Sequence, residues 1–209
     1  MKEKKLGLNL SKMDGTEHIF GAGNVTEKIP SHYSYKRYLP AVLDQGSLPY
    51  CVPYSVSTFL NWRENMAKGS KKDNKINYNE LYSSKTSTGE GMTFKEAFSY
   101  LRHKGVSSKA GLLKIEEYSK VGSAIFLKIA LIMNGPCFGA LPVYNYGKTF
   151  WKKNYGDELM GYHAIAIVGY DKNGFIIRNS WGKSYADGGY TYIPEDEMNY
   201  FVELWTISE

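Results

Sequence analysis

The chain has few cysteines for its length: its 209 residues contain two, Cys51 and Cys137. Two thiols can form at most one disulfide, which excludes both a disulfide framework and a four-thiolate zinc site. The first ten residues are charged and lack the apolar run of about 7–15 residues found in a signal peptide. We therefore expect a reducing, intracellular setting in which both thiols stay free.

Long apolar runs and a strong charge excess are also missing. No apolar run approaches the ~18 residues of a membrane-spanning helix. The net charge of +5 is too small to indicate a nucleic-acid binder, and the basic loop over 68–75 has no interleaved aromatic residues on which bases could stack. What is abundant is glycine (21), tyrosine (18) and hydrophobic residues (43%), which predict a sizeable core with many turns and strands.

The order of hydrophobic patterns predicts an α+β chain with two lobes. Apolar residues at spacings of three and four predict a helix from Cys51 to about Ala67. Pro53 fits only in the first turn, where no backbone donor is needed, and so it fixes the start near Cys51. Shorter helices are expected over 79–83, 93–103 and 123–133, and strands over 138–144, 163–170, 175–181, 189–193 and 202–207. We divide the chain into an irregular segment (1–40), a mainly helical lobe (41–134) and a mainly β lobe (135–209).

Cys51 is the more interesting of the two thiols because of its place in the chain. Unpaired N–H groups and the positive end of the helix dipole meet at a helix N-terminus, and both lower the pKa of a thiol. The residues alone leave two readings of Cys51 open, a nucleophile or a buried packing residue. Cys137 follows a proline at the start of a predicted strand, where packing in the core explains it.

A thiol nucleophile needs a base, and His163 is the best placed of the four histidines. It opens an apolar strand, although a histidine in that position can also be an ordinary core residue. The next strand ends with Asn179 and Trp181, which could orient the imidazole and screen that hydrogen bond from water.

The turn between these strands decides whether Asn179 can face His163. Asn173-Gly174 is typical of a two-residue hairpin turn, but that register would place Asn179 opposite Val168. We therefore predict a turn centred on Asp171, which pairs Asn179 with His163.

The sequence resembles the papain-like cysteine peptidases over about residues 40–207. The resemblance rests on three segments in the family's order: DQGSLPYC (44–51), HA followed by VGY (163–170), and NSWG followed by GY (179–190). It implies a two-lobed α+β fold, with the nucleophile at the N-terminus of a central helix in the helical lobe and an antiparallel β lobe. It further implies that Cys51 is the nucleophile, His163 the general acid/base, Asn179 its orienting partner and Gln45 the side-chain donor of the oxyanion hole. Trp181 matches the shield over the histidine.

Substrate contacts follow from the same resemblance. Gly91 resembles the wall residue along which the substrate backbone pairs, and Tyr50 and Tyr162 are expected beside it. The chain departs from the family at Pro49-Tyr50, where Gly-Ser is usual, and at Val52, where Trp is usual. Leu48 stands in place of the usual disulfide cysteine.

The resemblance therefore implies a cysteine endopeptidase that acts through an acyl-enzyme, with no cofactor and no metal. We expect a monomer that cleaves peptides or proteins, binds neither nucleic acid nor membrane, and is cytoplasmic or virion-associated, since the motif wording resembles bacterial and viral members. Two alternatives stay open: an inactive papain-fold protein that only binds peptides, and an amidase or isopeptidase for cell-wall peptides. Residues 1–40 are too short for the family's usual inhibitory pro-segment, yet they could still block the cleft.

Overall fold

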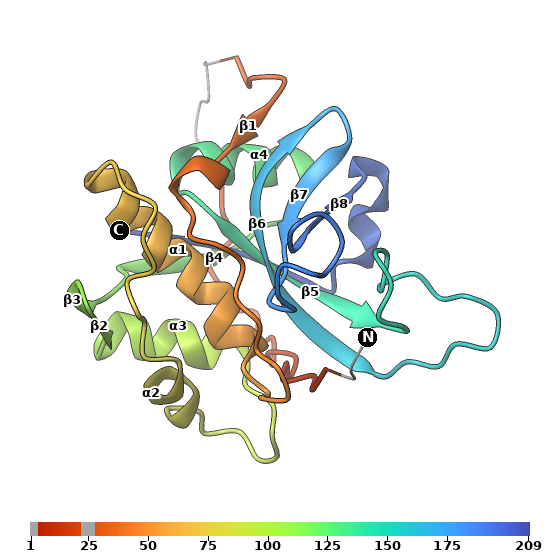
Figure 1. Ribbon diagram of the computed structural model, residues 1–209, viewed down its shortest axis with the longest axis horizontal. Helices are drawn as coiled ribbons and strands as arrows, with labels where there is room; N and C mark the ends of the chain where they lie inside the picture. Colours follow the sequence, from red (N-terminus) through yellow and green to blue (C-terminus); the bar gives the residue numbers. More distant parts are fainter. Residues whose placement is uncertain (1–3, 22–27) are drawn as a thin grey trace.

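The computed structural model describes residues 4–21 and 28–209 and shows helices packed beside a long twisted sheet (Figure 1). The helices fall where the periodicity predicts them: α1 (Cys51–Ala67), α2 (Tyr78–Ser83), α3 (Phe94–His103) and α4 (Ala124–Met133). Two short 3₁₀ turns, η1 (Lys36–Tyr38) and η2 (Glu195–Tyr200), complete the helical elements of the described chain. In the described part of the chain, no helix has the length and apolar character needed to cross a membrane.

The main sheet has seven strands in the order β4-β9-β5-β6-β7-β8, with β1 added beside β6, and all pairs are antiparallel. The sequence predicts five of these strands. Their observed bounds are β5 (Cys137–Val143), β6 (Gly161–Asp171), β7 (Gly174–Arg178), β8 (Tyr190–Ile193) and β9 (Glu203–Ser208).

The strands that the sequence does not predict are short. They are β1 (Tyr33–Ser34), β4 (Glu117–Lys120) and a separate hairpin of β2 (Val106–Ser108) and β3 (Gly111–Leu113). Two to four residues carry too little alternation to stand out in the sequence. A longer partner strand offers an edge to β1 and to β4, whereas β2 and β3 pair with each other. One of them, β1, ties the N-terminal region to β6, and β4 ties the helical part of the chain to β9.

The prediction of a turn centred on Asp171 is wrong. Asp171 pairs with Gly174, so the turn consists of Lys172 and Asn173. A bulge between Ile167 and Tyr170 then shifts the register by one residue, and β7 ends at Arg178. Asn179 therefore lies beyond the ladder, and its side chain reaches His163 diagonally.

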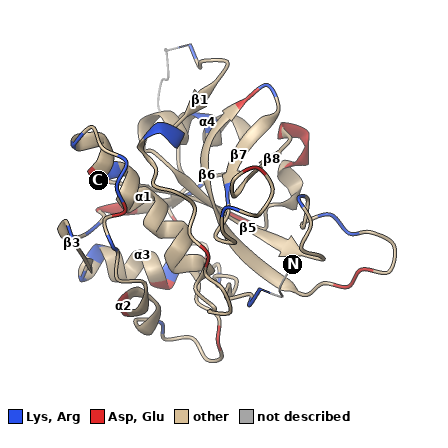
Figure 2. Ribbon diagram, in the orientation of Figure 1, with Lys and Arg blue, Asp and Glu red and all other residues tan. Residues whose placement is uncertain are grey.

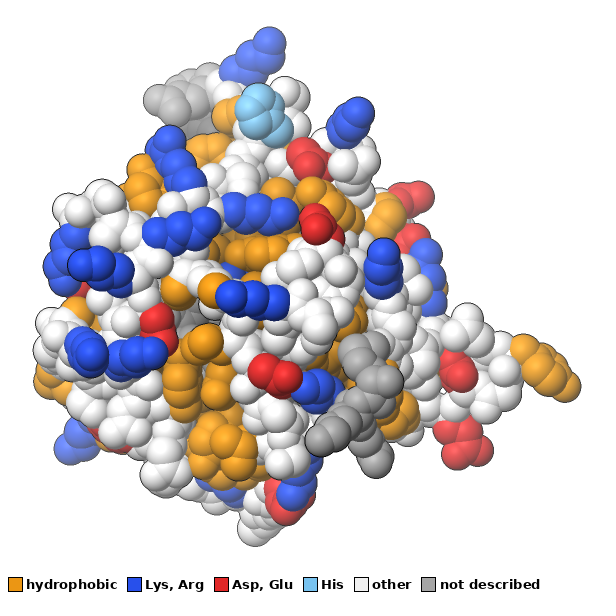
Figure 3. All heavy atoms as spheres, viewed as in Figure 1, with side chains coloured by type: hydrophobic (Ala, Val, Ile, Leu, Met, Phe, Trp, Pro, Cys, Tyr) orange, Lys and Arg blue, Asp and Glu red, His pale blue; other side chains and the backbone are white. Residues whose placement is uncertain are grey.

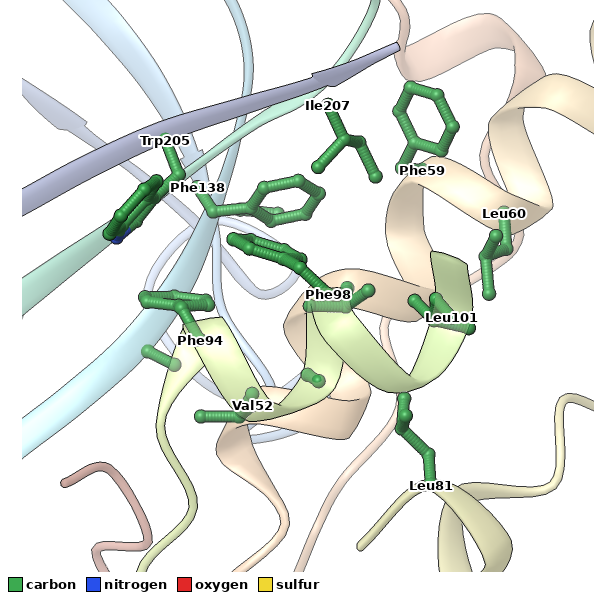
Figure 4. Packing of buried hydrophobic residues seen from close by; sticks show 14 of the residues in the cluster. Val52, Phe59, Leu60, Leu81, Phe94, Phe98, Leu101, Phe138, Trp205 and Ile207 are labelled. Carbon is green, nitrogen blue, oxygen red and sulfur yellow. The ribbon is translucent and has the colours of Figure 1, made fainter. Parts of the chain in front are cut away.

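Two hydrophobic cores cover the two faces of the sheet. The first lies between the sheet and α1 to α3, where Phe98 packs with ring centroids 5.6 Å from Phe138 and 5.9 Å from Trp205 (Figure 4). The second lies under α4 on the opposite face and includes Trp151 and Trp181. Charged residues of both signs are spread along the exposed helices and loops (Figure 2), and on the face seen in Figure 3 they lie among hydrophobic and polar side chains. The first core holds α1 against β6, and this junction is where the predicted site residues meet.

Candidate active site

Cys51 is the first residue of α1 and is completely buried. Tyr50 precedes the helix without any side-chain cap, so the N–H groups of the first turn stay open toward the thiol. Burial raises the pKa of the Cys51 thiol to about 11, although hydrogen bonding from the backbone N–H groups of Ala164 and Gly7 opposes this rise. The thiol is therefore protonated at neutral pH while it remains covered.

His163 and Asn179 form the hydrogen bond that the sequence predicts. His163 Nε2 lies 2.8 Å from Asn179 Oδ1. Because that oxygen can only accept, Nε2 carries the proton and Nδ1 is left as the basic nitrogen. The Nδ1 atom is buried and has no hydrogen-bond partner. Burial lowers the pKa of His163 to about 4, against the opposing effect of the Asn179 bond, so the ring is neutral at pH 7.

Trp181 covers this histidine, as expected for the shielding residue. Its ring stacks on the imidazole with centroids 4.6 Å apart and planes 26° apart. Phe150, from the long loop between β5 and β6, meets both rings at 5.7 Å and 4.9 Å. Apolar walls of this kind exclude water and strengthen the histidine–asparagine hydrogen bond.

Gln45 is fixed by Ser180, a residue that the sequence analysis does not assign to the site. The Ser180 hydroxyl donates to Gln45 Oε1 at 2.5 Å, and the Gln45 backbone N–H donates to the Ser180 carbonyl at 2.8 Å. The amide is thereby oriented with Nε2 as its outward donor. Nε2 donates to two carbonyl oxygens, those of Leu48 and Lys5, each at 2.9 Å.

The Lys5 carbonyl belongs to a segment that lies across the site, which we call the N-terminal strap (residues 4–11). In Figure 1 this red segment passes beside the start of α1. Leu8 is buried between the two lobes, in a parallel bridge with Met92 and an antiparallel bridge with Tyr162. Met92 N–H donates to Gly7 O at 3.0 Å, and Asn9 N–H donates to Met92 O at 3.1 Å.

Both ends of the strap are also anchored. At its start, Lys4 forms an ion pair with Asp44 at 2.6 Å. At its end, the Ser11 N–H donates to Glu203 at 2.5 Å. Glu203 is a buried carboxylate whose pKa is raised by burial, and its other oxygen accepts from the Trp205 indole at 2.7 Å.

The predicted substrate-contact residues line the path of the strap. The Gly91 carbonyl accepts from the Asn9 side chain at 2.9 Å, and a Cβ atom at Gly91 would lie 2.2 Å from Asn9 Oδ1. Tyr162 bridges Leu8 on the opposite side. The Tyr50 ring packs against Tyr82 with centroids 4.4 Å apart and planes tilted by 33°, and its hydroxyl donates to Asn79. The structure therefore brings Gly91 and Tyr162 to the cleft walls and places Tyr50 against α2.

The sequence leaves open whether residues 1–40 block the cleft, and it does not locate the strap or indicate Ser180 and Glu203. The leucines of the strap, Leu6, Leu8 and Leu10, alternate over too few residues to indicate a contact across the site. Ser180 and Glu203 act through neighbours that are distant in the sequence. Within residues 4–21 and 28–209, no group of three or more His, Cys, Asp or Glu side chains could hold a metal ion.

A family model and several known proteins match parts of this sequence. A family model described as "Papain family cysteine protease" matches residues 51–203. The chain is 32% identical over 89 residues to cathepsin B-like CP1 of Giardia intestinalis and 30% identical over 106 residues to cysteine proteinase 3 of Entamoeba histolytica. These stretches cover 38% and 46% of this chain, and only 29% and 33% of the two relatives' own lengths.

Solved structures are similar over nearly the whole chain. Xylellain, a cysteine protease from Xylella fastidiosa, superimposes with a TM-score of 0.81 at 20% identity, over 100% of this chain and 98% of that one. Procathepsin B S9 from Trypanosoma congolense gives a TM-score of 0.80 at 15% identity, over 98% and 86%. At these identities the likeness concerns the fold.

Proposed function

Because the chain belongs to the papain family of cysteine proteases, we propose that it is a cysteine endopeptidase whose cleft is covered by its own N-terminal strap. The observation that carries the proposal is the convergence of Cys51, His163, Asn179 and Gln45 at one junction between α1 and β6. A protein that only binds peptides has no use for a histidine held by Asn179 when the next residue, Ala164, meets a thiol at a helix N-terminus.

The proposed reaction begins when the cleft is open. The Cys51 thiol gives its proton to His163 Nδ1, and the sulfur attacks the carbonyl carbon of a peptide bond. The electron pair of the C=O bond moves to its oxygen, which Gln45 Nε2 and the Cys51 N–H stabilise. One such donor is worth about 2.7–4 kcal/mol. The intermediate collapses by breaking the C–N bond, and His163 protonates the departing amine.

Water completes the cycle. His163 Nδ1 takes a proton from water, whose oxygen attacks the thioester carbon. The C–S bond then breaks and releases a carboxylic acid and the Cys51 sulfur, which recovers its proton through His163. Throughout, the Asn179 bond keeps the ring in the tautomer that leaves Nδ1 free.

The strap accounts for the protonation states of the covered site. It fills the cleft between Met92 and Tyr162 and occupies the Gln45 donor with the Lys5 carbonyl. Water is excluded, which disfavours both a thiolate and an imidazolium. Displacing the strap would hydrate the site and allow the charged pair to form. We therefore propose that residues 4–11 keep the enzyme latent.

The remaining assignments are proposals of the same kind. We assign peptide or protein substrates to the chain, a monomeric state, and a cytoplasmic or virion-associated location, the last of which fits its two free, buried cysteines. We assign substrate contact to Gly91 and Tyr162 on the cleft walls, and to Tyr50 at the start of α1.

The test uses one substitution that lifts the strap and one that does not. Leu8→Asp places a carboxylate in the buried site between Met92 and Tyr162, whereas Leu10→Asp changes an exposed residue of the same segment (38% exposed). We expect Leu8→Asp to hydrolyse casein and Leu10→Asp to stay as slow as the native chain. The activity should disappear in the double variant Leu8→Asp, Cys51→Ser.

Other outcomes would replace the proposal. A folded Leu8→Asp variant that cleaves no peptide, and whose Cys51 is alkylated no faster than a free cysteine, would identify a peptide-binding protein. Cleavage of cell-wall peptide fragments without cleavage of casein would identify an amidase.

A further inference from the structure

A small polar cavity lies behind the active site, where α1 packs against β6, and Arg178 at the end of β7 also lines it. Its volume is about 20 Å³, and both lobes contribute to its lining. Roughly 10–15 Å³ is enough for one water molecule, so the cavity has room for a single small species. The residues that line it carry hydroxyls, amides and, in Arg178, a guanidinium, and none of these lining residues has a carboxylate.

Arg178 brings a buried positive charge to this cavity. The residue is 7% exposed, and its guanidinium cannot lose its proton. Its hydrogen bonds go to neutral oxygens: the Tyr190 hydroxyl at 2.6 Å and the Ala41 carbonyl at 3.2 Å. Among the ion pairs of the described chain, none includes Arg178. A buried charge without a counter-charge is costly, which indicates that something else supplies one.

A second lining group points to the same ligand. The Ser55 hydroxyl belongs to a residue that is 4% exposed, and its oxygen has no hydrogen-bond partner. Hydroxyl and guanidinium groups can both donate to one acceptor. The negative charge of Asp73 acts on Tyr78, one of the residues that line the cavity. Asp73 itself does not line the cavity, and it forms an ion pair with Lys75 at 2.8 Å.

We propose that this cavity binds one monovalent anion of about the size of chloride, held by Arg178 and Ser55. A water molecule would satisfy the Ser55 hydroxyl but would leave the guanidinium charge uncompensated. A sulfate or phosphate group, with four oxygens around its centre, is too large for the volume. Because Ala164 and Asn179 also line the cavity, the anion links the two lobes directly behind the catalytic residues.

The first test is crystallographic and uses bromide as the probe. Crystals of the native chain soaked in sodium bromide should show an anomalous peak in the cavity, within contact distance of Arg178 and Ser55. A peak that is absent there, with a water molecule refined in its place, would overturn the proposal.

The second test measures thermal unfolding in sodium chloride and in sodium gluconate at equal ionic strength. We expect the melting temperature of the native chain to rise with chloride in a saturable way. The rise should be roughly 5–10 °C at about a hundred times the dissociation constant. Arg178→Gln should abolish the rise, and Ser55→Ala should shift it to higher chloride concentrations.

The control removes a lysine charge outside the cavity. Lys36 lies over the same Tyr190 ring that Arg178 contacts, 4.4 Å from its centroid, and is not among the residues that line the cavity. Lys36→Gln should therefore keep the full chloride response. An equal response in Arg178→Gln and Lys36→Gln would show a general salt effect and refute the site. If Arg178→Gln does not fold, the bromide map and Ser55→Ala still decide the question.

Discussion

Replacing Gly7 by alanine tests directly whether the strap covers Cys51, because the structure leaves no room for an added methyl group. A Cβ atom at Gly7 would lie 2.1 Å from the Pro49 carbonyl oxygen, 2.4 Å from its carbon and 2.7 Å from the Pro49 Cα. These are backbone atoms, and favourable contacts between non-bonded heavy atoms lie at about 3.5–4.0 Å. In the Gly7→Ala variant, the strap must therefore move away from Pro49.

The size of the effect follows from the cost of overpacking. Inserting a methyl group into a well-packed site costs about 1–3 kcal/mol. If this cost falls on the covered state alone, the fraction of molecules with an open cleft rises about 5- to 140-fold, since 1.4 kcal/mol corresponds to a factor of ten. Pro49 itself is poorly able to yield, because it leads directly into α1 and the neighbouring Leu48 carbonyl is held by Gln45.

The assay is the rate at which iodoacetamide alkylates Cys51, followed by mass spectrometry of the intact chain and its peptides. Cys137 is an internal reference, because it is also buried and its thiol pKa is raised to about 12 by burial. Gly21→Ala is the matched control, since a Cβ atom at Gly21 has no neighbour within 4 Å. If folded Gly7→Ala reacts no faster than Gly21→Ala, the strap does not control access to the thiol.

Three further predictions concern the residues around the site. The pKa of His163 is lowered from 6.5 to about 4, so the folded state binds fewer protons than the unfolded chain, and stability present above pH 6.5 is lost as the pH falls toward 4. Between pH 7 and pH 5 the free energy of unfolding falls by about 2 kcal/mol for this reason, at 1.36 kcal/mol per pKa unit. Urea unfolding at the two pH values should show that the His163→Gln variant lacks this decrease. In a peptidase assay of the Leu8→Asp variant, adding Gln45→Ala should lower kcat about 10²- to 10³-fold. Adding Ser180→Ala instead should lower kcat less, because it only frees the Gln45 amide to rotate. Ser123→Ala removes the N-cap of α4 and should reduce the unfolding free energy by about 0.5–2 kcal/mol without changing the Cys51 alkylation rate.

The sequence was informative where local chemistry decides the structure. Pro53 fixes the start of α1 at Cys51, and the long periodic segments formed helices and strands within one or two residues of their predicted bounds. The partnership of His163 with Asn179 was also predicted, although the reasoning about the turn was wrong. A β-bulge and a diagonal side-chain contact bring Asn179 to His163, whereas the sequence predicts a direct cross-strand pair.

The sequence was uninformative where a contact depends on the shape of the assembled molecule. The place of the strap depends on neighbours from both lobes, Met92 on one side and Tyr162 on the other. In the sequence, Arg178 is an ordinary arginine at the end of a strand. Only the packed structure shows that it is buried and lines the same cavity as Ser55, whose hydroxyl has no hydrogen-bond partner. These features depend on which polar groups are left without hydrogen-bond partners after folding, and no local sequence pattern shows this.

The most direct test of the central claim is the capture of an acyl-enzyme on Cys51. The Leu8→Asp variant is mixed with a peptide ester, quenched in acid within one turnover, and analysed by mass spectrometry. We predict an added mass equal to the acyl group on the peptide that contains Cys51, and its absence in the variant that also carries Cys51→Ser. Ester hydrolysis that proceeds without an adduct, or that survives the loss of Cys51, would contradict the account.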